Sequence, residues 1–330
     1  MLACKSRIGN ETNSAGGLTR RNLLAMAAPL AVAPEALRGA RTPLSPRAFK
    51  ARLRGPILSF PTVYDTRFAI DFDGVRAILK KGLGGGAGVV ALTKGNNQYD
   101  TLTHDEVRQL TRVVVETVED RAPVIAATGS WWTGQAVDFA RYATSLGAAA
   151  IQVAMPPDGS DESYYEHFRA IAGSTPRAIV IHGQPSMALL RKLKPIENVV
   201  AFKEEFSPDY TLPIYEEFGD RWNIFAGGSK SRLLTYLPYG MHAYYSAFST
   251  FAPRVAMNFW HAVERKDLAA AGQFVLRYDV PFFRRWSMPF WTATLEHFGI
   301  ARRYMRPPVV SFSDAQMKDV GLFYRGLGLS

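Results

Sequence analysis

Short apolar runs alternate with longer segments in which apolar residues recur every three or four positions, from residue 55 to the end of the chain. An apolar run bounded by turn residues predicts a strand buried on both faces, whereas the recurring pattern predicts an amphipathic helix. The predicted strands cover residues 57–62, 89–92, 124–127, 149–153, 178–181, 199–202, 222–226 and 243–245.

A helical pattern follows each predicted strand. The clearest start is Thr103, where Thr-His-Asp-Glu has the spacing of a capping box, and Gly147 is the residue expected to end a helix in a left-handed conformation. Eight strand–helix units predict an α/β fold of the (β/α)8 TIM barrel type better than an open doubly wound sheet. The barrel domain is expected over residues 55–330, with a C-terminal helical extension from about residue 253.

Residues 1–54 have a different character. Arg20 and Arg21 precede a short apolar stretch that ends in Ala31-Val32-Ala33, a pattern typical of a secretory leader of the twin-arginine type. We therefore expect residues 1–40 to be a leader that directs export to the periplasm. The alternative is a cytoplasmic enzyme with an N-terminal extension. Residues 41–54 are rich in arginine and are expected to be a basic linker.

Composition narrows the class of partner. The chain has 330 residues, a net charge of +10 and one cysteine, Cys4, so an intrachain disulfide is excluded. Its arginines are spread over both ends without zinc-finger spacing or a ribonucleoprotein aromatic motif, which favours a solvated basic surface over nucleic-acid binding. No later segment is apolar over a membrane's thickness, so a membrane partner is not expected. No histidine–carboxylate spacing indicates a metal site.

Lys203 ends the apolar run of residues 199–202. In a (β/α)8 barrel, catalytic groups lie at the C-terminal ends of the strands. A lysine buried there has a lowered pKa and retains some neutral amine that can attack a carbonyl carbon. The alternative is a structural lysine that extends towards solvent and pairs with Glu204 or Glu205.

Four stretches resemble the dihydrodipicolinate synthase and N-acetylneuraminate lyase superfamily. They are Leu-Thr-His-Asp-Glu at 102–106, Pro-Val-Ile-Ala-Ala-Thr-Gly-Ser at 123–130, Val-Val-Ala-Phe-Lys-Glu at 199–204 and Tyr-Gly-Met-His-Ala-Tyr-Tyr-Ser at 239–246. The resemblance extends over roughly residues 55–322. It implies that Lys203 forms a Schiff base with a small carbonyl substrate, that no metal or organic cofactor is needed, and that the chain forms a homo-oligomer, often a tetramer.

The chain departs from that family at three places. The loop after the second strand reads Thr-Lys-Gly-Asn-Asn-Gln-Tyr at 93–99, where the family has Gly-Thr-Thr-Gly-Glu to hold a carboxylate. Met-Pro-Pro-Asp at 155–158 replaces the family's Pro-Tyr-Tyr, so the proton-relay tyrosine has no counterpart in register. His-Gly-Gln-Pro at 182–185 replaces Tyr-Asn-x-Pro.

We therefore predict a lyase of the class I aldolase type acting on a 2-oxo acid or related carbonyl compound. Lys203 is the predicted nucleophile and His182 the proton carrier, because a histidine pKa lies near neutrality. The predicted substrate-binding residues are Lys94, Gly95, Asn96, Asn97 and Ser246. Two alternatives remain open: a non-catalytic barrel that binds a small carbonyl or acid ligand, and a hydratase or hydrolase that uses His182 without an imine.

Overall fold

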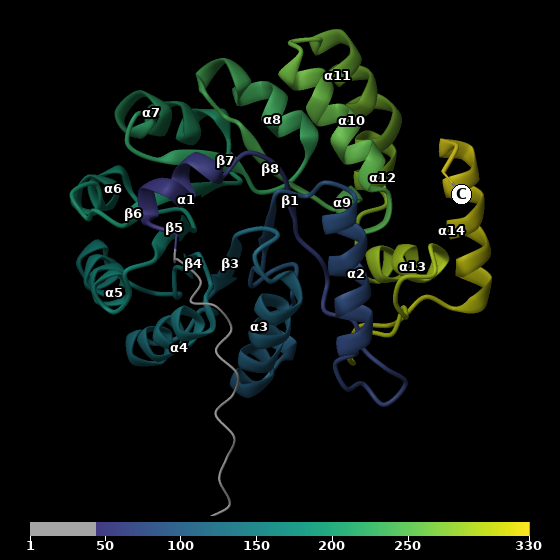
Figure 1. Cartoon of the computed structure of the whole chain (residues 1–330), viewed down its shortest axis with the longest axis horizontal. Coiled ribbons are helices and arrows are strands. Elements are labelled where there is room, and N and C mark those ends of the chain that lie inside the picture. The colour runs from purple at the N-terminus through teal and green to yellow at the C-terminus, as the bar shows by residue number, and fades with distance from the viewer. Residues whose placement is uncertain (1–43, 330) are drawn as a thin grey trace, which may run out of the picture. The chain divides into compact units, whose positions relative to one another are not determined.

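The computed structural model describes residues 44–329, and in this part of the chain eight parallel strands close into a barrel in chain order. The first strand pairs with both the second and the eighth, which closes the sheet (Figure 1). The predicted (β/α)8 class is confirmed. The strands are β1 (Gly55–Leu58), β2 (Val89–Ala91), β3 (Val124–Ala127), β4 (Ala150–Ala154), β5 (Ala178–His182), β6 (Val199–Glu204), β7 (Asn223–Ala226) and β8 (Ala243–Ser246).

Helices surround the strands in Figure 1. The predicted capping box is present, with Thr103 and Glu106 each bonded to the other's backbone, and Gly147 has the expected left-handed φ of 100°. The helices that follow β1 to β7 are α2 (Phe72–Gly84), α3 (His104–Val118), α4 (Thr133–Leu146), α5 (Asp161–Gly173), α6 (Met187–Leu193), α7 (Pro208–Phe218) and α8 (Lys230–Tyr236), with short 3-10 turns at Tyr99–Thr101 and Leu237–Tyr239.

The buried residues form two layers, because successive side chains of a strand point to opposite faces. Ile57, Val180, Ala201 and Phe225 belong to the cluster inside the barrel. Phe202 belongs to the larger cluster between the sheet and the surrounding helices. This alternation decides which polar residues near the strand ends can reach the mouth of the barrel.

The expected basic linker is in part a helix, α1 (Pro46–Arg52). Ser45 caps its first turn, and Phe49 and Leu53 are fully buried with the interior cluster. The helix contacts β5 and β6, and Figure 1 shows it lying across one end of the barrel. The sequence did not indicate this helix, because two apolar residues among many basic ones give little helical periodicity.

The predicted C-terminal extension is helical and is divided by short breaks. Its helices are α9 (Phe248–Phe251), α10 (Pro253–Glu264), α11 (Leu268–Phe274), α12 (Val280–Arg284), α13 (Met288–His297) and α14 (Asp314–Leu327), with a π-helical turn at Val275–Asp279. Ser287 and Pro289 start α13 and so separate it from α12. The sequence analysis missed α14, although Ser313 and Gln316 form a capping box there.

Two predictions concern the leader and the oligomeric state. The predicted leader, residues 1–40, lies outside the described residues, and the homo-oligomer stays a prediction. Between residues 44 and 329, no helix combines the length and the apolar character needed to cross a membrane.

Candidate active site

Strand β6 places Lys203 in the mouth of the barrel. Ala201 belongs to the interior cluster, so Lys203, two residues later, points to the same side. The side chain of Lys203 is only 5% exposed. A long cationic side chain is rarely buried to this extent without partners, and the structure supplies them.

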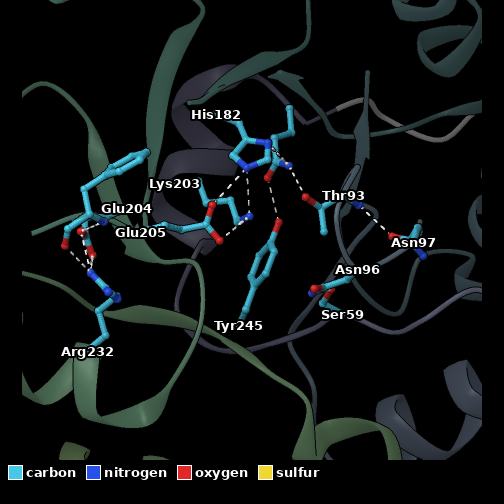
Figure 2. A network of polar contacts seen from close by, with 12 residues as sticks. Ser59, Thr93, Asn96, Asn97, His182, Lys203, Glu204, Glu205, Arg232 and Tyr245 are labelled. Atoms are coloured by element: carbon cyan, nitrogen blue, oxygen red, sulfur yellow. Dashed lines mark hydrogen bonds and ion pairs between the residues drawn. The ribbon is translucent and has the colours of Figure 1, made fainter. Parts of the chain in front are cut away.

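Lys203 Nζ lies 2.9 Å from Glu205 Oε1 and 3.2 Å from His182 Nε2. His182 ends β5 and is in register with Lys203, so the parallel pairing sets this approach. His182 Nε2 is also 3.1 Å from Glu205 Oε2. The ring of Tyr245, on β8, covers the ammonium at 5.0 Å. Figure 2 shows the lysine, histidine and glutamate side chains converging on one another.

Burial lowers the pKa of the Lys203 ammonium, and the Glu205 carboxylate beside it partly opposes that shift. Burial and the charge of Lys203 lower the pKa of His182, so the imidazole is neutral. Burial alone would raise the pKa of Glu205, but the hydrogen bond from His182 and the charge of Lys203 lower it to about 2. The site therefore combines an ammonium group with a lowered pKa, a neutral imidazole and an ionised carboxylate.

A buried polar network supports His182 from behind. Gln152, on β4, has Nε2 at 2.9 Å from Thr93 Oγ1 and at 3.3 Å from His182 Nδ1. The Tyr245 hydroxyl donates to Gln152 Oε1 at 2.8 Å. The sequence analysis missed Gln152, Tyr245 and the role of Glu205. One signal was available for Gln152, which is the only polar residue in the apolar run Ala150–Ala154.

The loop after β2 divides into a structural and an exposed part. Asn97 is fully buried: its Oδ1 accepts from the Thr93 amide at 2.8 Å and its Nδ2 donates to the Phe60 carbonyl at 3.1 Å. Its backbone carbonyl accepts from the Thr62 hydroxyl at 2.7 Å. The Asn97 amide thus ties this loop to the segment after β1, and substrate binding by Asn97 stays a prediction.

Lys94, Gly95 and Asn96 remain near the barrel mouth. Lys94 Nζ lies 3.1 Å from Ser130 Oγ and 3.5 Å from an Asp100 carboxylate oxygen, and its charge contributes to lowering the pKa of His182. Asn96 Nδ2 donates to Ser59 Oγ at 2.8 Å. A Cβ added to Gly95 would meet open space. This edge of the mouth therefore presents a cation and amide and hydroxyl groups.

Ser246 does not join the site. Tyr245 belongs to the interior cluster, so its neighbour Ser246 points outward, on the same face as Tyr244, which packs edge-on against Phe259 of α10. The Ser246 hydroxyl is buried and has no hydrogen-bond partner. Ser246 therefore lies at the predicted strand end but on the outer face, and substrate binding by Ser246 stays a prediction.

Glu204 also faces away from Lys203. Its carboxylate is fully buried and accepts hydrogen bonds from Arg232 Nη1, at 2.8 and 2.9 Å, and from the Thr211 hydroxyl at 2.8 Å. A cavity of about 360 Å³ lies next to Glu205 and has Arg232 in its wall. Polar groups of the β7–α8 loop and apolar residues of the C-terminal helices line it, namely Gly227, Gly228, Ser229, Ser231, Arg232, Val275, Asp279, Val280 and Phe283.

No cluster of three or more histidine, cysteine, aspartate or glutamate side chains in residues 44–329 could hold a metal ion.

Comparison with solved structures supports the same architecture. A dihydrodipicolinate synthase from Bacillus anthracis superposes with a TM-score of 0.74 at 23% identity, covering 83% of this chain and 98% of that one. An N-acetylneuraminate lyase from Fusobacterium nucleatum superposes with a TM-score of 0.76 at 16% identity, covering 84% and 99%. At these identities the likeness concerns the fold.

Sequence comparison identifies the family. A 4-hydroxy-tetrahydrodipicolinate synthase from Phenylobacterium zucineum is 27% identical over 79% of this chain and 92% of its own length. A probable 5-dehydro-4-deoxyglucarate dehydratase from Streptomyces avermitilis is 34% identical over 70% of this chain and 74% of its own length. The model of the dihydrodipicolinate synthetase family matches residues 52–322. The resemblance predicted from four short stretches is thus confirmed, and this chain belongs to the dihydrodipicolinate synthetase family.

Proposed function

We propose that this protein is an imine-forming lyase in which Lys203 condenses with the carbonyl group of a small 2-oxo acid. The observation that carries the proposal is the position of Lys203 Nζ, which is buried in the barrel mouth within 3.2 Å of His182 and 2.9 Å of Glu205. A buried amine beside two proton carriers has what imine formation requires.

The condensation can be followed atom by atom. Lys203 loses one proton to Glu205, and its neutral nitrogen attacks the carbonyl carbon to give a carbinolamine. The second proton passes from nitrogen to the alkoxide oxygen, and the resulting hydroxyl departs as water after accepting a proton from His182 Nε2, which Glu205 replaces with the proton taken from Lys203. Nitrogen keeps its last proton, so loss of water leaves an iminium, which draws electrons from the adjacent carbon and so permits loss of a proton or a carbon substituent there.

Lys94 supports a carboxylate-bearing substrate. The pair of threonines that holds the carboxylate in related enzymes is absent, but the Lys94 ammonium, with Ser130 and Asn96 on the same rim, offers a charge and hydrogen-bond donors. A charge-assisted contact of this kind is stronger than the neutral contacts it replaces. We infer that Lys94 binds the carboxylate of the oxo acid.

We infer that the remainder of the substrate binds in the cavity beside Glu205. Its volume of about 360 Å³ accommodates several carbon atoms beyond the reacting carbonyl. Serines and an arginine on one wall suit hydroxyl or carboxylate groups. Several relatives, at 26% to 34% identity, carry the name 5-dehydro-4-deoxyglucarate dehydratase. These names favour elimination of water from the iminium over cleavage of a carbon–carbon bond.

Borohydride trapping tests the proposal. The protein is incubated with pyruvate and with a panel of 2-oxo acids carrying hydroxyl groups, reduced, and analysed by intact mass and peptide mapping. We expect one adduct per chain on Lys203, absent from Lys203→Met and retained by the exposed-lysine control Lys192→Met. No adduct across the panel, or an adduct that persists in Lys203→Met, would sink the imine mechanism.

The same panel separates the two alternative functions. A non-catalytic barrel would bind an oxo acid without turnover in either the wild type or any variant. A hydratase that uses His182 without an imine would keep its turnover in Lys203→Met and lose it in His182→Ala. Burial of a lysine amine costs desolvation free energy, and neither alternative function needs an amine at this position. The burial and pairing of Lys203 therefore favour neither of them.

A further inference from the structure

We infer that Gln152 is a positioning residue that holds His182 in the tautomer with its proton on Nε2, and thereby makes Glu205 the base and His182 the acid of the site. The inference rests on the proposed function for its catalytic consequence. The tautomer itself is a property of the free protein and can be measured without substrate.

Glu205 favours the His182 tautomer that carries its proton on Nε2. An ionised carboxylate has no proton to donate and can only accept. Its Oε2 lies 3.1 Å from His182 Nε2, so this contact is a hydrogen bond only when Nε2 carries a proton. Because the pKa of Glu205 is lowered to about 2, the carboxylate is ionised throughout the neutral range.

Gln152 favours the same tautomer from the other side of the His182 ring. A neutral imidazole with its proton on Nε2 has a bare Nδ1, which needs a donor. Gln152 Nε2 lies 3.3 Å from Nδ1. The amide is held in this orientation from both ends, because Tyr245 donates to its Oε1 at 2.8 Å and Thr93 Oγ1 accepts from its Nε2 at 2.9 Å.

Burial raises the pKa of the Tyr245 hydroxyl well above its ordinary value, so this group keeps its proton and acts as the donor. Gln152 is itself fully buried. A flipped amide would place its oxygen against a bare imidazole nitrogen. The Glu205 carboxylate just after β6 and the Gln152 amide on β4 thus favour the same tautomer.

This tautomer assigns the two proton carriers. With Nε2 protonated, Lys203 cannot donate to His182, although the two nitrogens are 3.2 Å apart. The only acceptor left to the ammonium among these groups is Glu205 Oε1, at 2.9 Å. Glu205 therefore receives the proton that activates Lys203, whereas His182 Nε2 presents a proton to the oxygen that leaves as water.

The groups that act on the charge of His182 come from three elements. Lys203 and Glu205 lie at the end of β6, and Lys94 lies in the loop after β2. Tyr245 on β8 acts through Gln152. Changing Gln152 to glutamate adds a carboxylate at Nδ1, which stabilises a proton there and favours the imidazolium between two carboxylates. Changing it to methionine removes the donor and keeps the volume.

The test is nitrogen NMR of protein carrying ¹⁵N-labelled histidine, without substrate, over the neutral and alkaline range. The chain has six histidines, and His182→Asn identifies the His182 signals by their loss. We expect a protonated Nε2 and a bare Nδ1 in the wild type, a ring that stays doubly protonated to higher pH in Gln152→Glu, and a mixture of tautomers in Gln152→Met. Tyr245→Phe, which removes one restraint on the amide, should give a smaller shift in the same direction as Gln152→Met.

Either of two results overturns the inference: a proton on Nδ1 in the wild type, or an unchanged tautomer in Gln152→Met. The substitution Gln109→Glu, at an exposed position of α3, controls for added charge. In the trapping assay, Gln152→Met should slow adduct formation by roughly tenfold or more, since a positioned proton donor contributes about 10²–10⁴-fold. Absence of any wild-type adduct with the expected tautomer would contradict the proposed function and leave the role of Gln152 in place.

Discussion

Glu204 and Glu205 are adjacent in the chain, yet their carboxylates point in opposite directions, Glu204 to Arg232 and Glu205 to Lys203 (Figure 2). The period of two along a strand produces this division. Glu204 fastens β6 to α8, whereas Glu205 raises the pKa of the Lys203 ammonium. The same substitution at each of these two glutamates therefore compares the contact with Lys203 against the contact with Arg232.

Glu205→Gln should shift the pH dependence of imine trapping. The Lys203 amine becomes reactive as pH rises through its pKa, so the trapping rate should rise with pH to a midpoint below the ordinary lysine value of 10.5. The Glu205 carboxylate raises that pKa, so its removal should move the midpoint to lower pH still, and the maximal rate should fall because the base is lost.

Glu204→Gln is the matched control for this experiment. It should leave the midpoint of the trapping profile in place and reduce the free energy of unfolding, because Arg232 loses its buried carboxylate partner. An equal shift of the midpoint in both variants would show that general charge, and not the contact with Lys203, controls the amine.

Lys94→Gln should weaken binding of substrates that carry a carboxylate. A hydrogen bond to a charged group contributes about 1.5–3 kcal/mol, so KM for a 2-oxo acid should rise by roughly ten- to a hundredfold. The corresponding methyl ester should show little change between wild type and variant. Measurement of trapping rates against concentration for both compounds tests this expectation.

Asp100→Asn should strengthen substrate binding at Lys94, the opposite of the effect expected for Lys94→Gln. The Asp100 carboxylate lies 3.5 Å from Lys94 Nζ and competes with a bound anion. Its removal should lower KM for the acid and leave the ester unaffected. An unchanged KM in both Lys94→Gln and Asp100→Asn would contradict the assignment of Lys94 as the carboxylate anchor.

The barrel and the buried lysine at its mouth were predictable because both follow from local signals. Eight apolar runs mark strands buried on both faces, and Lys203 is conspicuous at the end of one of them. Which neighbours face Lys203 depends on strand register and on side-chain alternation. Ser246 faces outward although its strand end was predicted correctly, because an apolar run does not show which of its residues point inward, and one residue changes the face.

Residues far apart in sequence explain what else was missed. Gln152 acquires its importance from Thr93 and Tyr245, which lie 59 and 93 residues away along the chain. Asn97 was expected at the substrate because asparagine is a good hydrogen-bond donor. Only the fold reveals that the Phe60 carbonyl and the Thr93 amide already occupy both ends of its side chain.

Asn97→Ala should destabilise the protein far more than Asn96→Ala. Loss of the buried amide leaves the Thr93 amide and the Phe60 carbonyl without these partners, at a cost of about 1–3 kcal/mol for each buried group. Asn96 is partly exposed and makes one bond, to Ser59, so its removal should cost about 1 kcal/mol or less. Urea unfolding of both variants measures the difference, and equal losses would contradict the structural role given to Asn97.

Lys230 and Asp279 form a second buried ion pair, which joins α8 to the π-helical turn of the C-terminal extension. Asp279 accepts from Lys230 Nζ at 2.5 Å and from the Lys230 amide at 2.6 Å, and both side chains are at most 3% exposed. The ring of Phe248 lies 4.1 Å from the same ammonium. Asp279→Ala should reduce the free energy of unfolding by about 3–5 kcal/mol, because it leaves a buried charge unpaired.

The double variant Lys230→Met/Asp279→Leu should recover most of this loss, since replacement of a buried ion pair by apolar residues of similar volume is often neutral. Thermal and urea unfolding of the single and double variants measure the recovery. Because Asp279 also lines the cavity beside Glu205, borohydride trapping with pyruvate should be measured in parallel. A double variant as unstable as Asp279→Ala would show that the carboxylate acts through the Lys230 backbone amide and not through the ion pair.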